Sequence, residues 1–154
     1  MSWDAPDRRW QFAVGEEPPR DLPAAWASAT RAMTRDLGCR RHGRPVSFRN
    51  VMWSILADDG AVCVGFALAG EADVDAYQRC LEYLLDTTAA QALVWMADDV
   101  QYELSGYEFV QWPFNGRRML QAQIVDDRAV WVDPITGTVD AAIGELCPPR
   151  TDQL

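Results

Sequence analysis

The feature that most constrains the fold is a pair of strand-like segments separated by a tight turn. Residues 46–57 are rich in β-branched and aromatic side chains, and residues 61–68 form a nearly continuous apolar run. The sequence Asp58-Asp59-Gly60 between them is typical of a hairpin turn. The two segments therefore predict an antiparallel hairpin, in which the apolar strand is covered on both faces or lies under helices.

Three other segments have the apolar spacing of amphipathic helices. The first covers residues 23–37, where Pro23 suits the first turn and Gly38 suits the position after the helix. The second covers residues 74–86, and the third covers residues 89–104 with a threonine before it as the expected N-cap. One unbroken helix through both of these is the less favoured alternative. The apolar stripes are Trp26, Ala29 or Thr30, Met33 and Leu37, then Val74, Tyr77, Leu81, Leu84 and Leu85, then Leu93, Met96, Ala97, Val100 and Leu104.

Shorter strand patterns lie on either side of these segments. One strand is expected over residues 10–14, and a three-strand meander is expected within residues 107–142. The meander contains Asp133-Pro134-Ile135-Thr136-Gly137, which combines the residues that β-turns favour. After the first short strand, the element order is therefore helix, hairpin, two helices and meander.

This order predicts an α+β fold, with an antiparallel sheet of about five strands and two or three helices packed mainly on one face. We expect residues 1–154 to form a single globular domain, with residues 1–20 as an N-terminal arm and residues 148–154 as a flexible tail. Seven tryptophans are many for this length, and we expect them to anchor the core because each ring buries about 150–250 Å².

The four cysteines, Cys39, Cys63, Cys80 and Cys147, are far apart and form no closely spaced pair. The sequence begins without the basic segment and long apolar run of an export signal, and it has no run of about 18 apolar residues that could span a membrane. We therefore expect a cytoplasmic protein whose thiols are reduced and form no disulfide.

Few residues carry a recognisable chemistry. His42, the one histidine, lies in an arginine-rich loop, and no nucleophile motif accompanies it. Cys39 and His42 have the spacing of half a zinc site, but a second ligand pair is missing. Asp99 and Glu103 share a helix face and could hold a metal ion, although a solvated acidic face is the favoured interpretation. We therefore expect no metal and no cofactor, and the sequence identifies no catalytic residue, which favours a binding protein over an enzyme.

Charge is the strongest functional signal in this sequence. The net charge is -9, and residues 58–108 contain eleven acidic residues against one arginine, whereas residues 35–49 carry a net charge of +4. An acidic surface repels phosphate groups, so we expect no binding to nucleic acid and none to membranes. The expected partner is another protein, for which a basic surface would be complementary.

We therefore predict that the chain acts by binding another protein, as immunity proteins, inhibitors, adaptors and chaperones do, either as a monomer or as a homodimer. The predicted binding face combines acidic residues with aromatic anchors: Asp75, Glu82, Asp98, Asp99, Glu103, Trp95 and Tyr102. Two alternatives stay open. One is a structural subunit of an assembly, and the other is a small-molecule-binding or enzymatic domain with a scattered site that uses residues such as Tyr77, Trp95, Tyr102, Glu103 and Trp112.

Overall fold

The computed structural model describes residues 8–148, which form two helices and nine strands. In chain order the elements are β1 (Arg8–Ala13), α1 (Ala24–Asp36), β2 (His42–Gly43), β3 (Val51–Asp58), β4 (Ala61–Leu68), β5 (Tyr77–Leu84), α2 (Ala89–Tyr107), β6 (Val110–Gln111), β7 (Gln121–Val125), β8 (Arg128–Val132) and β9 (Val139–Ala142). The strands pair in antiparallel fashion, so the predicted α+β class is confirmed. Positions 1–7 of the predicted arm, and positions 149–154 of the predicted tail, lie outside the described residues.

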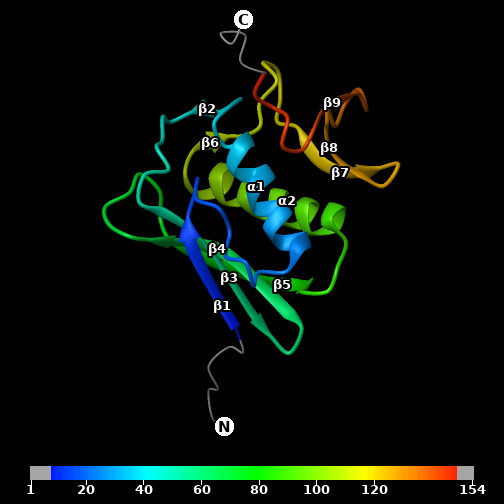
Figure 1. The fold of residues 1–154 in the computed structure, drawn as a ribbon. Coiled ribbons are helices and arrows are strands. Elements are labelled where there is room, and N and C mark those ends of the chain that lie inside the picture. Colours follow the sequence, from blue (N-terminus) through cyan, green and yellow to red (C-terminus); the bar gives the residue numbers. More distant parts are fainter. Residues whose placement is uncertain (1–7, 149–154) are drawn as a thin grey trace, which may run out of the picture.

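A four-stranded sheet in the order β1-β3-β4-β5 has the predicted hairpin at its centre (Figure 1). Val51 of β3 pairs with Leu68 of β4, and the pairing continues to the turn, where Asp59 and Gly60 have φ values of 51° and 81°. Positive φ values of this kind belong to the turns whose twist matches that of a hairpin. The predicted strand over residues 10–14 is β1, which pairs with β3 along one edge.

Both helices lie on the same side of this sheet (Figure 1). Alternate residues of the strands are buried, which gives the sheet one face rich in large apolar side chains: Trp10, Phe12, Trp53, Ile55, Val62, Val64 and Phe66. The two observed helices follow the predicted segments 23–37 and 89–104, and the hydroxyl of Thr88 accepts a hydrogen bond from the N–H of Gln91 as the predicted N-cap. Six of the seven tryptophans lie within the described residues and anchor the core as expected: Trp10, Trp26, Trp53, Trp112 and Trp131 are buried and Trp95 is half-buried. Trp3 lies outside the described residues.

The remaining strands do not join the main sheet, so three sheets replace the predicted single sheet of about five strands. β2 pairs with β6, and β7, β8 and β9 form a three-stranded sheet. α2 lies between this sheet and the main sheet and contacts both (Figure 1). Met96 and Leu104 of α2 share one core with Phe66 and Trp131. The sheet of β7, β8 and β9 therefore covers the side of α2 that the main sheet leaves open.

The prediction of a helix over residues 74–86 is wrong, because β5 occupies this segment and pairs with β4. Arg79 and Tyr83, four positions apart, pair with two residues of β4 that are only two positions apart, so β5 bulges between them. The extra residues break the alternation of inward and outward side chains. Leu81 and Leu84 consequently have helix-like spacing although both are exposed on a strand.

The prediction of four free thiols is also wrong, because the structure contains the disulfides Cys39–Cys147 and Cys63–Cys80 and leaves no cysteine free. The first joins the end of α1 to the C-terminal segment over a sequence separation of 108, and the second joins β4 to β5 over a separation of 17. Pairing of cysteines this far apart depends on the fold and not on local spacing. His42 has no role as a zinc ligand with Cys39, and its ring stacks on Phe114 with ring centroids 4.5 Å apart.

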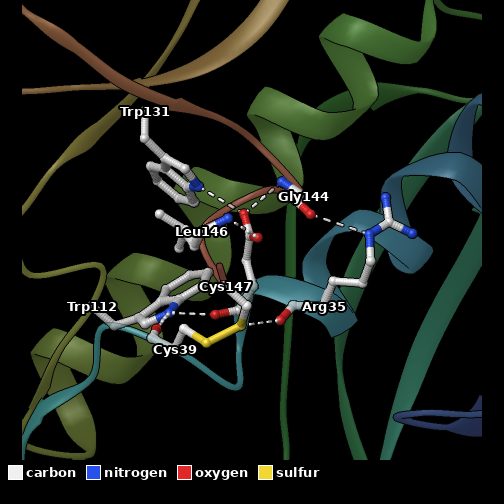
Figure 2. Close-up of a disulfide and its surroundings, with 8 residues drawn as sticks. Arg35, Cys39, Trp112, Trp131, Gly144, Leu146 and Cys147 are labelled. Carbon is white, nitrogen blue, oxygen red and sulfur yellow. Dashed lines mark hydrogen bonds between the residues drawn. A yellow bond between two sulfur atoms is a disulfide. The ribbon is translucent and has the colours of Figure 1, made fainter. Parts of the chain in front are cut away.

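The carboxylate of Asp36, three positions before Cys39, is buried and binds the C-terminal segment that carries Gly144, Leu146 and Cys147 (Figure 2). Asp36 accepts hydrogen bonds from Nε1 of Trp131 at 2.8 Å and from the backbone N–H groups of Gly144 at 2.6 Å and Leu146 at 3.0 Å. These four residues are called the Asp36 network below. Burial raises the pKa of Asp36, although all three hydrogen bonds oppose that shift.

Candidate functional site

A hollow of about 340 Å³ opens between β5 and α2. Six residues line it: Arg79, Leu81, Tyr83, Asp98, Asp99 and Tyr102. The first three are alternate residues of β5, and the last three lie within little more than one turn of α2. We call this feature the β5–α2 hollow.

The only basic residue of the hollow binds two acidic residues of α2. Arg79 donates to Oδ1 of Asp99 at 2.5 Å and to Oε1 of Glu103 at 3.0 Å. Both acids are buried, with Asp99 only 2% exposed, because residues four apart on a helix project from the same face. The favoured interpretation of Asp99 and Glu103 as part of a solvated acidic face is therefore wrong for these two residues.

Arg79 also contacts aromatic rings. Its guanidinium carbon lies 4.7 Å from the ring centroid of Tyr102 and 5.1 Å from that of Tyr77. Such contacts stabilise a partly desolvated cation through the negative face of the ring. Although burial opposes the shift, the hydrogen bonds and charges of Asp99 and Glu103 raise the pKa of Arg79, which keeps this side chain charged.

Asp99 is incompletely satisfied despite its ion pair. Its Oδ2 atom is buried and has no hydrogen-bond partner among the described residues. Burial raises the pKa of Asp99 to about 6, even though Arg79 and the nearby hydroxyl of Tyr83 favour the ionised form. Buried polar atoms without a partner are uncommon in folded proteins, and each one calls for a physical reason.

A second carboxylate at the hollow, that of Asp98, has no ion-pair partner within residues 8–148. Asp98 is exposed at the residue level, yet desolvation of its carboxyl group raises its pKa to about 6. Asp98, Asp99 and Glu103 together supply three carboxylates against the one guanidinium of Arg79. The hollow and its immediate surroundings are therefore acidic at neutral pH.

A stack of aromatic rings supports Tyr83 in the wall of the hollow. The ring centroid of Tyr83 lies 5.4 Å from that of Trp95, and Trp95 lies 6.3 Å from Trp26. Trp26 is fully buried, and its Nε1 donates to the backbone oxygen of Leu84 at 3.2 Å. The stack thus fixes the end of β5 against both helices and gives the hollow a rigid apolar wall.

The structure brings together some of the predicted binding residues and separates others. Asp98, Asp99, Glu103 and Tyr102 meet at the hollow, and Trp95 reaches it through Tyr83. Two predicted residues lie elsewhere: Glu82 is exposed in the β5 bulge, and the backbone N–H of Asp75 donates to Glu108 at 2.7 Å.

The scattered site considered as an alternative does not assemble as a unit. Tyr77 lies beside Arg79, whereas Nε1 of Trp112 donates to the backbone oxygens of Asp36 and Cys39, next to the Asp36 network. Arg79 and Leu81 were not predicted as site residues, because the apolar spacing of residues 74–86 indicated a helix and the segment is the strand β5. A signal for Arg79 was present nonetheless, because it is the one basic residue among eleven acidic residues in the segment 58–108.

Large apolar side chains are exposed on β5 and α2, the two elements that form the hollow. Leu81 and Tyr102 line it, and the ring of Tyr107 contacts that of Tyr102 with centroids 6.0 Å apart. Leu84 lies at the end of β5, an edge strand of the main sheet, where it lines a separate hollow with Pro23, Gly60, Leu85 and Asp86. More than half of each of these four side chains is exposed. We call Leu81, Leu84, Tyr102 and Tyr107 the β5–α2 face.

No protein-family model, no curated protein and no solved structure matches this chain. Within residues 8–148, no three His, Cys, Asp or Glu side chains come together in a way that could hold a metal ion. In the same range, neither helix is long and apolar enough to cross a membrane. What the site offers a ligand or partner is the acidic lining of its hollow and the exposed apolar side chains of β5 and α2.

Proposed function

We propose that the protein acts by binding another protein through the β5–α2 face. The observation that carries this proposal is the exposure of four large apolar side chains along an edge strand and the adjacent helix. Soluble proteins rarely expose such groups without a use, and aromatic side chains are frequent anchors at protein interfaces. An edge strand adds unpaired backbone groups that an extended segment of a partner can bind.

The burial of the acidic residues changes how the predicted interface would work. Asp99 and Glu103 are engaged with Arg79 and cannot form a broad charged surface. Asp98 and Glu82 remain exposed and can attract a basic partner from a distance. Affinity would then come from Leu81, Tyr102 and their neighbours, and charge would mainly set the association rate.

The competing small-molecule function is supported by one observation. The volume of the hollow, about 340 Å³, lies at the lower end of the range for ligand pockets, and it contains two carboxyl groups with raised pKa values. A small molecule would use the hollow alone. A partner protein would also cover Leu84 and Tyr107, which lie outside the lining.

The proposal extends to the cellular compartment, for which the paired cysteines are the evidence. Two disulfides favour an oxidising compartment over the predicted cytoplasm, where thiols are kept reduced. Counting the thiols of the denatured protein, taken from its own cells with alkylation at lysis, separates the two locations. No free thiol supports an oxidising compartment, and a full set of four supports the cytoplasm.

The binding function is tested with a face variant and a matched control. The face variant carries Leu84→Asp and Tyr107→Asp, at positions 53% and 58% exposed, and the control carries Ile124→Asp and Val125→Asp on the edge strand β7, at positions 41% and 39% exposed. Protein captured from an extract of the producing cells is identified and then purified for titration. We expect the wild type and the control to bind it and the face variant to lose at least about tenfold in affinity. Equal binding by all three proteins would contradict the proposal.

A further inference from the structure

We propose that the β5–α2 hollow is a recognition pocket for an arginine side chain that the partner protein presents. This inference rests on the proposed protein-binding function and specifies the chemistry of its central contact. Three features of the hollow support it: the unpaired oxygen of Asp99, the net negative charge and the apolar and aromatic walls.

The unpaired oxygen is the observation that points most directly to a ligand. Asp99 is 2% exposed and lines the hollow, and its Oδ2 atom has no hydrogen-bond partner among the described residues. Leaving a buried carboxylate oxygen unpaired is costly in free energy, and a donor from outside the chain would remove that cost. Asp98 offers a further carboxylate on the same wall, without an ion pair in the described part of the chain.

The charge of the hollow selects a cation. Asp98, Asp99 and Glu103 outnumber Arg79 by three charges to one, so a monovalent cation would reduce the imbalance without reversing it. Phosphate and carboxylate ligands would be repelled. Mg²⁺ and Ca²⁺ require about six or more oxygen ligands, and one oxygen each of Asp99 and Glu103 is already bound to Arg79.

The walls select an arginine among the possible cations. Leu81, Tyr83 and Tyr102 give the hollow an apolar lining that suits the aliphatic stem of a long side chain. A planar guanidinium stacks on aromatic rings and matches carboxylates with its fork of donors, whereas an ammonium group is compact and more strongly hydrated. Tyr102 already accepts a guanidinium on its ring, that of Arg79 at 4.7 Å.

The experiment uses a capped peptide, Gly-Gly-Arg-Gly-Gly, as the probe and the same peptide with citrulline or lysine as comparisons. Citrulline keeps the shape of arginine and removes its charge. Binding to the full chain is followed by amide chemical shifts. We expect the arginine peptide to bind with a dissociation constant of about 1 mM and to shift the amides of Leu81, Asp98 and Tyr102. The citrulline peptide should bind at least about tenfold more weakly than the arginine peptide. The lysine peptide should bind at least about threefold more weakly.

Two variants and one control link the binding to the hollow. Asp98→Asn and Asp99→Asn should each weaken binding of the arginine peptide by roughly tenfold. Asp126→Asn, which removes an equal charge in the exposed turn after β7, should leave it unchanged. The exposed position of Asp98 makes its variant safe for folding, and thermal unfolding of all three verifies this.

Three results would overturn the inference: equal binding of the arginine and citrulline peptides, equal or tighter binding of the lysine peptide, or shifts confined to residues away from the hollow. Failure of the inference differs from failure of the proposed function. If only the inference fails, the variant with Leu84→Asp and Tyr107→Asp still loses the natural partner. If only the function fails, the arginine peptide still binds the hollow and that variant keeps the partner.

Discussion

Asp36 and Asp99 are both buried carboxylates, but the protein supplies them with different numbers of hydrogen-bond donors. Both oxygens of Asp36 accept hydrogen bonds, from three donors on β8 and the C-terminal segment. One oxygen of Asp99 is bound by Arg79, and the other has no partner within residues 8–148. Equal burial therefore leaves the two side chains in different states. The carboxylate of Asp36 is fully hydrogen-bonded and stabilises the fold, and the unpaired oxygen of Asp99 is the one to which we assign a ligand.

The surroundings of the two residues also differ, because those of Asp36 are closed to solvent and those of Asp99 border an open hollow. The Asp36 network lies beside the Cys39–Cys147 disulfide, and the ring of its member Trp131 packs against that of the buried Trp112 with centroids 5.3 Å apart (Figure 2). The β5–α2 hollow is open to solvent and borders the exposed side chains of Leu81 and Tyr102. The comparison teaches that hydrogen-bond satisfaction and access, and not burial alone, separate a structural carboxylate from a candidate binding group.

The largest expected effect concerns the disulfide beside the Asp36 network. Replacing Cys39 and Cys147 by serine should lower the free energy of unfolding by about 4–5 kcal/mol, because this disulfide closes a long loop. Replacing Cys63 and Cys80 should cost about 3 kcal/mol, because that loop is shorter. Urea unfolding of the two double variants measures the difference. A greater loss of stability on replacing Cys63 and Cys80 would show that the disulfide beside the Asp36 network is not the more stabilising of the two.

The next effect compares the two carboxylates directly. Asp36→Asn should lower the free energy of unfolding by about 3 kcal/mol, because the amide N–H₂ group faces backbone donors and leaves at least one unpaired. Asp99→Asn should cost less than about 1 kcal/mol, because Arg79 keeps its ion pair with Glu103. Denaturant unfolding at pH 7 gives both values. Equal losses would remove the distinction between a structural carboxylate and a binding carboxylate.

A smaller effect should appear in the pH dependence of stability. The pKa of Asp99 is raised from 3.8 to about 6, so the folded state holds this proton more tightly than the unfolded state. Stability should therefore fall by roughly 2 kcal/mol as the pH rises from about 4 to 6.5. Asp36 and the exposed Asp98 have raised pKa values too and act in the same direction. The other titratable groups that influence Asp99 are Arg79, Glu103, Tyr77 and Tyr83.

The measurement is a series of unfolding curves between pH 4 and 7 for the wild type and Asp99→Asn. The variant should have the flatter profile, since it cannot take up that proton. Asp133 acts in the opposite direction: although burial opposes the shift, hydrogen bonds from Arg118 and from the N–H groups of Thr136 and Ile135 lower its pKa. Its contribution is present above pH 3.8 and is lost below it, outside the window used here. Identical slopes for the two proteins would contradict the role of Asp99.

The smallest expected effect on stability is at Asp98. Asp98→Asn should change the free energy of unfolding by no more than about 0.5 kcal/mol, because the residue is exposed and makes no ion pair among the described residues. Thermal unfolding at pH 7 checks this. A loss comparable to that of Asp36→Asn would mean that the hollow, like the Asp36 network, is mainly structural.

The sequence by itself determined the elements that depend on local signals. The turn at Asp59-Gly60 and the apolar runs beside it predicted the β3–β4 hairpin, and helical spacing with the Thr88 cap predicted α2. These signals are reliable because each uses residues within one or two turns of chain, where backbone geometry decides the contacts. The acidic segment and four residues of the candidate site, Asp98, Asp99, Tyr102 and Glu103, were also found in this way.

Only the tertiary structure decided the features that join distant segments. Residues 77–84 have helix-like apolar spacing, and pairing with β4 makes them a bulged strand instead. That strand brings Arg79 to Asp99 and Glu103, 20 and 24 positions away, and turns a predicted solvated face into a buried ion pair beside a hollow. Asp36 meets Gly144 and Leu146 across more than a hundred positions, as Cys39 meets Cys147. The physical reason is the same in each case: such contacts depend on how the helices and sheets pack around one core, and local sequence does not encode that packing.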